Sequence, residues 1–153
     1  MQTVLITGGT GMVGTSLTQL LLSKGYQVII LTRKLQDSKI PNLTYAVWDI
    51  GKGYIDPLAI EKADTIVHLA GAGVADKRWS IKRKQEIVDS RVMSGALLVK
   101  YLTEIPHQVK TVVAASAIGW YGPDSEQSIQ NGFTETDPVD AAFLGDTCKR
   151  WED

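Results

Sequence analysis

The residues best suited to bind a ligand form a glycine-rich segment near the start of the chain. Gly8, Gly11 and Gly14 recur every third residue, directly after an apolar, β-branched segment and directly before a helical pattern. In that context the spacing predicts dinucleotide binding, because Gly8 permits a tight turn, Gly11 lets the backbone approach a pyrophosphate and Gly14 lets a helix pack on a strand. Free N–H groups at the start of the helix would face the phosphates. The predicted contacts here are Gly8, Thr10, Gly11, Met12 and Val13.

Two alternatives bear on this segment. Glycines also form plain turns, which would leave it without a ligand. A Walker-type nucleotide loop is excluded, because no Gly-Lys-Ser or Gly-Lys-Thr follows the glycines.

A basic pair predicts which dinucleotide is bound. An NAD site of this kind normally has an acidic residue at the end of the second strand, to bind the adenosine ribose. This chain has Thr32, Arg33 and Lys34 there instead. A guanidinium can bind a 2′-phosphate through two charge-assisted hydrogen bonds, so we expect NADP(H), with contacts from Thr32 and Arg33. The alternative is a solvated basic pair at a strand end.

The composition is that of one globular domain. The chain has 153 residues, of which 44% are hydrophobic and 22% charged, and its net charge is −1. No bulk field would attract nucleic acid or an anionic membrane, so neither is an expected partner. A single cysteine excludes an internal disulfide, and two isolated histidines offer no metal-ligand spacing. With no apolar run of bilayer length and no signal-like start, we expect a cytoplasmic protein.

Alternating strand and helix patterns predict the scaffold. Five apolar, β-branched runs indicate buried strands: Thr3–Thr7, Gln27–Thr32, Thr44–Trp48, Thr65–Ala70 and Val109–Ser116. Helical spacing is clearest in Met12–Lys24, closed by Gly25, and in a long helix from a Ser80 cap to about Thr103. The apolar face expected for the long helix is Ile81, Val88, Val92, Gly95, Ala96, Val99 and Leu102.

Continuous apolar strands separated by helices indicate a parallel sheet covered on both faces. The predicted fold is therefore α/β: a Rossmann-type, doubly wound parallel sheet of about five strands. A long polar segment, Ala117–Asp140, predicts a functional or mobile loop, and Ala141–Asp153 has a helical pattern.

The motifs together resemble a known family. The glycine segment, Thr32-Arg33, His68-Leu69-Ala70-Gly71, Asp76-Lys77-Arg78-Trp79, Ser90-Arg91, Ser116 to Gly122 and Cys148-x-x-Trp151-Glu152 look like the atypical short-chain dehydrogenases of the NAD-dependent epimerase/dehydratase family, often called nucleoside-diphosphate-sugar epimerases. The resemblance spans the whole chain. Members continue into a smaller substrate-binding lobe, so we expect residues 1–153 to be a truncated NADP(H)-binding Rossmann domain.

The resemblance implies several site residues. Leu69 and Ala70 would line the cofactor, although strand burial alone also explains them. Arg91 stands where extended members have an asparagine, and either reaches the cofactor or forms an ion pair on the helix surface. Ser116 lies near the family's substrate-binding serine or threonine, with Tyr121 in the following loop. Either side chain would hydrogen-bond a reacting carbonyl, or else Ser116 ends a strand and Tyr121 packs the loop.

The family's catalytic pair is absent. Members that transfer hydride use Tyr-x-x-x-Lys, where the lysine lowers the tyrosine pKa. If Glu152 marks the glutamate that often follows the pair, the two positions fall on Leu144 and Cys148. His68 and Cys148 show no sign of ligand or nucleophile roles, and the tryptophans Trp79, Trp120 and Trp151 either frame a pocket or anchor loops.

Two functions from different classes follow. One is an NADP(H)-dependent oxidoreductase or epimerase that uses another proton donor on a small-molecule substrate of unknown identity. The other is a non-catalytic NADP(H)-binding or sensing protein. An interaction module that binds no dinucleotide is a third. Exposed apolar surface beside the expected missing lobe also predicts self-association as a homodimer.

Overall fold

One six-stranded sheet organises the molecule. The computed structural model describes residues 2–153. The strands are β1 (Thr3–Thr7), β2 (Gln27–Thr32), β3 (Leu43–Asp49), β4 (Tyr54–Ile55), β5 (Thr65–His68) and β6 (Thr111–Ala114), in the order β4-β3-β2-β1-β5-β6. All neighbours are parallel except β4, which pairs antiparallel with β3. The predicted doubly wound α/β fold is confirmed. The additional strand β4 was not predicted, because its two residues are too few to show a periodic pattern.

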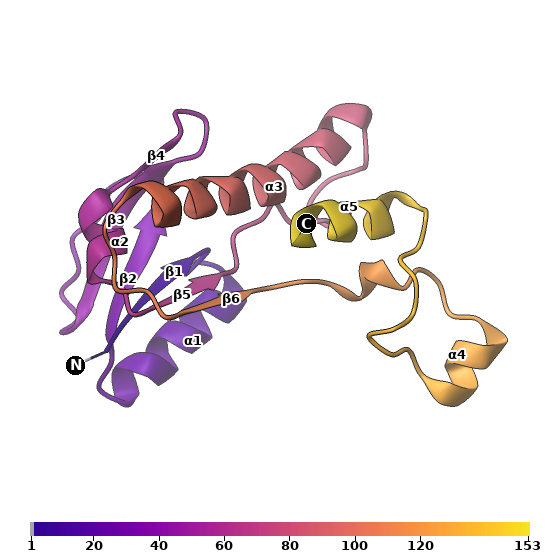
Figure 1. Ribbon diagram of the computed structural model, residues 1–153, viewed down its shortest axis with the longest axis horizontal. Coiled ribbons are helices and arrows are strands. Elements are labelled where there is room, and N and C mark those ends of the chain that lie inside the picture. The colour runs from indigo at the N-terminus through magenta and orange to yellow at the C-terminus, as the bar shows by residue number, and fades with distance from the viewer. Residues whose placement is uncertain (1) are drawn as a thin grey trace.

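Helices lie on both faces of the sheet, as Figure 1 shows. Their bounds are α1 (Met12–Ser23), α2 (Pro57–Lys62), α3 (Ile81–Glu104), α4 (Glu126–Asn131) and α5 (Phe143–Glu152), with a 3-10 turn η1 (Ile118–Trp120). The α3 helix begins as predicted, because the Ser80 side chain accepts a hydrogen bond from the Arg83 N–H at 3.2 Å. Within residues 2–153, no helix combines the length and the apolar character needed to cross a bilayer.

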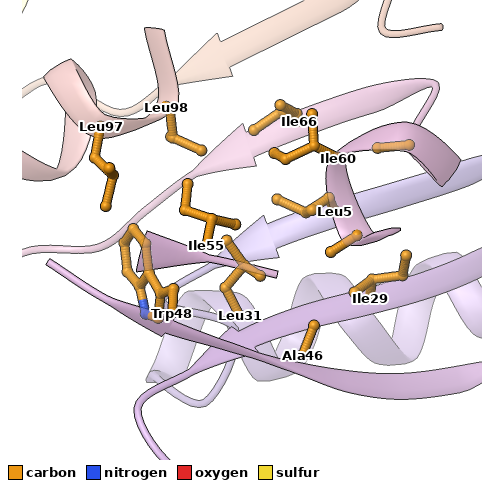
Figure 2. Packing of buried hydrophobic residues seen from close by; sticks show 12 residues of the cluster. Leu5, Ile29, Leu31, Ala46, Trp48, Ile55, Ile60, Ile66, Leu97 and Leu98 are labelled. Atoms are coloured by element: carbon orange, nitrogen blue, oxygen red, sulfur yellow. The ribbon is translucent and has the colours of Figure 1, made fainter. Parts of the chain in front are cut away.

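The two faces of the sheet form two separate cores. In β1, Val4 and Ile6 face one cluster and Leu5 faces the other, because successive strand residues point to opposite faces. The Val4 cluster packs against Leu17 and neighbouring leucines of α1. The Leu5 cluster packs against α2 and α3, and Figure 2 shows Leu97 and Leu98 of α3 directed into it. This double cover holds the strand ends in fixed positions.

The predicted apolar face of α3 was wrong in part. Ile81 and Val99 are 91% and 63% exposed, whereas Ile87, Leu97 and Leu98 are buried. The buried side of the helix also carries two polar residues, Arg83 and Ser94. Because these two face inward to bond the β5 end and the following loop, hydrophobic periodicity alone placed the face incorrectly.

The polar segment predicted as a loop contains two short elements. Residues 117–140 include η1 and α4, and α4 begins with a capping box between Ser125 and Ser128. Figure 1 shows this segment extending away from the sheet, beyond α5. The α4 part is ordered by its own hydrogen bonds, whereas η1 packs against Leu144 and Cys148 of α5.

Candidate functional site

The carboxyl ends of three neighbouring strands form one edge. Thr7 of β1 is in register with His68 of β5, and His68 is in register with Ala114 of β6. The segments that follow these strands are the glycine turn, Leu69–Ala70 and Ser116. In doubly wound sheets a ligand binds in the crevice at this edge, where the strand order reverses on either side of β1. The fold thus brings most of the predicted site residues to one place.

The glycine turn is tightly constrained. Gly8 has φ +68°, and a Cβ there would lie 2.8 Å from the Leu69 carbonyl carbon, so this position requires glycine. A Cβ at Gly14 would lie 2.6 Å from the Gly9 Cα, which confirms the close helix–strand packing predicted there. Gly9 was missed by sequence reasoning. Its Cβ would meet the Ile30 side chain at 2.8 Å, a contact set by the neighbouring strand and invisible in local spacing.

The start of α1 faces the crevice without a side-chain cap. Gly11 is the N-cap, and within the described residues no side chain caps the N–H groups at this end. The turn before it is closed by the Gly11 N–H, which donates to the Gly8 carbonyl at 3.0 Å. Met12 and Val13 are 86% and 60% exposed. Uncapped N–H groups beside glycines, which have no side chain in the way, are suited to bind a pyrophosphate.

Thr32 is the last residue of β2, and Arg33 follows it. The Thr32 hydroxyl donates to the Lys34 carbonyl at 2.6 Å and so shapes the turn that presents Arg33. Arg33 is exposed, and no ion pair within residues 2–153 involves it. Its guanidinium is available to a phosphate, while the solvated-pair interpretation stays open.

A buried polar network joins β1, β5 and α3 beneath this crevice. The Thr7 hydroxyl lies 2.6 Å from His68 Nδ1, and Ser94 Oγ lies 3.1 Å from His68 Nε2. Burial lowers the pKa of His68 from 6.5, which favours the neutral ring. As predicted, His68 is packed in the interior rather than placed to bind a ligand directly.

Two arginines of α3 hold the loop after β5. Arg91 donates from Nη1 to the Ala72 and Ile87 carbonyls, both at 3.0 Å, and its guanidinium lies 5.0 Å from the Trp151 ring centroid. The predicted surface ion pair of Arg91 is not formed within residues 2–153, and its guanidinium contacts the loop after β5; its contact with the cofactor stays a prediction. Arg83, which the sequence analysis missed, donates to the Gly73 carbonyl at 2.6 Å.

Arg83 is a buried charge with partners. Its side chain is 7% exposed and pairs with Glu86 at 2.7 Å and with Asp76 at 3.5 Å. The hydrogen bond from Arg83 lowers the pKa of Glu86 below 4.5. No signal in a single sequence identifies such a residue, because arginine on a helix usually faces solvent.

Both predicted catalytic residues line one pocket. Ser116 and Tyr121 border an open pocket of about 490 Å³ together with Ala117, Ile118, Trp120, Glu135 and Glu152. The Ser116 hydroxyl donates to the Glu152 carboxylate, a partner the sequence analysis missed. The Tyr121 ring stacks on Phe133 with centroids 4.8 Å apart. Tyr121 thus packs its loop and faces the pocket as well. A pocket of about 430 Å³ at the amino-terminal edge of the sheet contains none of the predicted residues.

The two positions aligned with the missing catalytic pair are packing positions. A Cβ at Gly119 would lie 3.0 Å from the Leu144 Cβ and 3.6 Å from the Cys148 sulfur, so both side chains press on η1. Burial raises the pKa of the Cys148 thiol, which keeps it protonated. Leu144 has no ionisable group, and burial disfavours the thiolate form of Cys148.

Tryptophans anchor the surrounding loops. Trp79 Nε1 donates to the Val74 carbonyl at 2.7 Å, and Trp120 Nε1 donates to the Asp137 carbonyl at 3.2 Å. Trp120 also lines the pocket beside Ser116, so anchoring and framing, the two predicted alternatives, are both observed for it.

Comparisons with known proteins agree with this geometry. The model of the NAD dependent epimerase/dehydratase family matches residues 4–143. An epimerase family protein of Staphylococcus haemolyticus is 37% identical over 155 residues, covering 99% of this chain and 48% of that protein. The crystal structure of a human epimerase family protein with NADPH is 30% identical with a TM-score of 0.76, covering 99% and 48%. The structure of MoeE5 with UDP-glucuronic acid and NAD is 25% identical with a TM-score of 0.74, covering 97% and 46%. The chain thus spans about half the length of the curated relatives it matches.

Proposed function

The chain belongs to the NAD-dependent epimerase/dehydratase family, and we propose that it binds NADP(H) at the carboxyl edge of its sheet as the cofactor half of an oxidoreductase or nucleoside-diphosphate-sugar epimerase. The observation that carries this proposal is the glycine turn. Gly8 lies against the Leu69 backbone, and the uncapped start of α1 faces the same crevice. The fold supports a dinucleotide spanning from the glycine turn toward β6.

The residues divide between the two ends of the cofactor. The N–H groups of Met12 and Val13 would bind the pyrophosphate, with Gly8, Thr10 and Gly11 leaving room for it. Arg33 would bind the 2′-phosphate of the adenosine ribose beyond β2. Leu69 and Ala70 would lie under the middle of the cofactor. This division follows the order of the strands β2, β1 and β5 along the sheet.

NADP(H) rather than NAD(H) is favoured by charge. Within this family, a solved neighbour was crystallised with NADPH and another with NAD. The end of β2 carries Arg33 and Lys34 and lacks the acidic residue that binds an unphosphorylated ribose. A carboxylate there would repel a 2′-phosphate, whereas a guanidinium attracts it.

The substrate would react beside Ser116. A bound nicotinamide would supply or accept a hydride, and the β5–β6 side of the crevice, beside the Ser116 pocket, would hold it. The Ser116 hydroxyl, oriented by the Glu152 carboxylate, would hydrogen-bond the reacting oxygen of the substrate, with Tyr121 at the same pocket wall. Arg91 would position the backbone beneath the cofactor through the Ala72 carbonyl.

The cofactor assignment is tested by calorimetric titration with NADPH and, separately, NADH. We expect NADPH to bind more tightly. Arg33→Ala should weaken NADPH binding roughly ten- to a hundredfold, the effect of about 1.5–3 kcal/mol from a hydrogen bond to a charged group. The effect on NADH should be small.

Lys39→Ala is the matched control, because it removes the same charge from an exposed position in the same connection. An equal loss in both variants would assign the effect to bulk charge. Unchanged NADPH affinity in Arg33→Ala would remove the NADP(H) preference from the proposal.

A second candidate is a non-catalytic NADP(H)-binding or sensing protein. Leu144 and Cys148 favour it, because both are packed against η1 where the family's proton-transferring pair would stand. NADPH oxidation by the full-length protein with a panel of carbonyl compounds and sugar nucleotides separates the two functions. Turnover lost in Ser116→Ala supports the enzyme, and tight binding without turnover supports the sensor.

A further inference from the structure

The hydroxyl of Thr7 holds together two segments of the candidate cofactor crevice. Its oxygen accepts hydrogen bonds from the backbone N–H groups of Leu69 and Ala70, both at 3.1 Å. These are the same residues whose backbone lies against Gly8. The position of this wall relative to the glycine turn therefore depends on how the Thr7 hydroxyl is oriented.

Counting donors and acceptors fixes that orientation. A hydroxyl oxygen has two acceptor sites and one proton, and the Leu69 and Ala70 N–H groups are both donors that cannot accept that proton. The Leu69 N–H is shared with the Thr7 backbone carbonyl at 3.2 Å. The Thr7 proton must then go to its remaining partner, His68 Nδ1, at 2.6 Å. It follows that Nδ1 carries no proton and accepts.

The rest of the chain of hydrogen bonds closes on α3. With Nδ1 accepting, the ring proton of a neutral His68 is on Nε2 and is donated to Ser94 Oγ at 3.1 Å. Ser94 in turn donates to the Ser90 carbonyl at 2.7 Å. The Ser94 hydroxyl also lies 3.0 Å from the Arg91 carbonyl, so its proton has an acceptor on α3 in either case. With the ring proton on Nδ1 instead, the Thr7 hydroxyl proton would have no acceptor among its partners in residues 2–153, which favours the Nε2–H tautomer.

We propose that His68 is a positioning residue for the cofactor crevice: as the neutral Nε2–H tautomer it orients the Thr7 hydroxyl, which fixes the Leu69–Ala70 backbone against the glycine turn. The step from this network to cofactor affinity rests on the proposed function. A proton on Nδ1 would turn the Thr7 hydroxyl away and displace one of the two backbone donors.

The surroundings of the ring contain few charges. β1 presents Thr7 to the ring, β6 has Ala114 in register beside it, and α3 presents Ser94. Arg91, three residues before Ser94, directs its guanidinium to the Ala72 and Ile87 carbonyls. Desolvation is the cause that lowers the His68 pKa, which agrees with a neutral ring.

The tautomer is tested directly by imidazole nitrogen–proton correlation NMR. His107→Gln removes the second of the two histidines, which is exposed, and leaves His68 as the sole signal. We expect the Nε2–H pattern and no titration of the ring at its ordinary pKa of 6.5. The Nδ1–H pattern, or titration at that value, overturns the proposal whether or not NADPH binds.

The positioning role is tested by NADPH titration. Thr7→Val removes the hydroxyl at nearly constant volume and should weaken binding about tenfold, the usual effect of losing hydrogen bonds of this kind. Thr7→Ser restores the hydroxyl and should restore the affinity. His68→Phe combined with Thr7→Val should cost no more than either change alone, because both break one network.

The outcomes separate this inference from the proposed function. If Thr7→Val does not fold, Ser94→Ala is the second variant, since it removes the acceptor at Nε2 and should also weaken NADPH binding. Unchanged affinity in a folded Thr7→Val, or additive losses in the double variant, overturns the positioning role. Absence of NADPH binding in the wild type defeats the proposed function and with it the positioning role, while the tautomer is decided by the spectrum alone.

Discussion

The centre of the sheet and its β6 edge differ in how far they are buried. Around β1, β2 and β5 both faces are covered, and every residue of β1 is buried. All four residues of β6 are exposed, with Val112 and Val113 at 50% and 52%. Of the buried hydrophobic residues, all but Cys148 precede residue 99. The glycine turn therefore lies on a rigid support, whereas the Ser116 pocket lies on a nearly uncovered one.

The difference separates cofactor binding from substrate chemistry. Nucleotide binding beside β1, at the centre of the sheet, would need only elements that this chain already packs together. The pocket beside β6 has fewer packed neighbours, and the curated relatives extend to about twice this length. Self-association through the apolar surface beside the expected missing lobe stays a prediction.

The largest predicted effect is on stability, when an apolar side chain is shortened at the centre of the sheet rather than at its β6 edge. Ile66 of β5 is fully buried, so Ile66→Ala should lower the free energy of unfolding by about 2–5 kcal/mol. Val113→Ala on β6 should change it by less than about 1 kcal/mol, because half of that side chain already contacts water. Urea unfolding of both variants measures the contrast. Equal losses would mean that β6 is covered in solution, by a second copy for example.

A smaller loss should follow when the glycine turn is crowded. Gly14→Ala places a Cβ against the backbone of Gly8 and Gly9, which cannot move aside as a side chain would. We expect about 1–3 kcal/mol of destabilisation and loss of NADPH binding. Gly95→Ala is the control within a helix: a Cβ there meets nothing within 4 Å, so it should stabilise the chain by up to about 1 kcal/mol. NADPH affinity retained in Gly14→Ala would remove the turn from the binding site.

The structure of the sheet centre around β1 was also easier to predict from the sequence than that of the β6 side. The strands β1 and β2, the helix α1 and its Gly25 terminus follow from local spacing, since both the hydrophobic period and the glycine positions agree with the fold. Gly8 and Gly14 were assigned correct structural roles for the same reason. Gly9 was missed, because its need for glycine arises from Ile30 on another strand.

The region of α3, the loop after β5 and the Ser116 pocket depends on contacts between distant residues, which the local spacing of residue types does not encode. Arg83 was missed because its partners, the Gly73 carbonyl and Asp76, belong to a loop that only the fold brings beneath α3. Glu152 was treated as an alignment marker, and its bond to Ser116 spans 36 residues. Hydrophobic periodicity placed the inward face of α3 only in part, because buried polar groups interrupt the pattern: Val88 is buried as predicted, whereas Val99 is exposed.

The smallest predicted effect is a pH dependence of stability, to which His68 and Glu86 contribute in separate pH intervals. Burial lowers the pKa of His68 below 6.5, so the unfolded chain takes up a proton at a higher pH than the folded chain. Stability from this residue should be complete above about pH 6.5 and should fall as the pH decreases from there to the folded-state pKa. Glu86 acts in a separate, lower interval: its pKa is lowered from 4.5 by Arg83, and its contribution is lost as the pH falls through that lowered value.

Urea unfolding across both intervals, in the wild type and in His68→Gln, resolves the two contributions. The variant should lose the decline that begins near pH 6.5 and keep the lower one. Glu86→Gln should do the reverse: it should keep the decline near pH 6.5 and lose the lower one, because the carboxylate that pairs with Arg83 is gone. A decline near pH 6.5 that persists in His68→Gln would place the titrating group outside the Thr7–His68–Ser94 network, in the less buried part of the molecule.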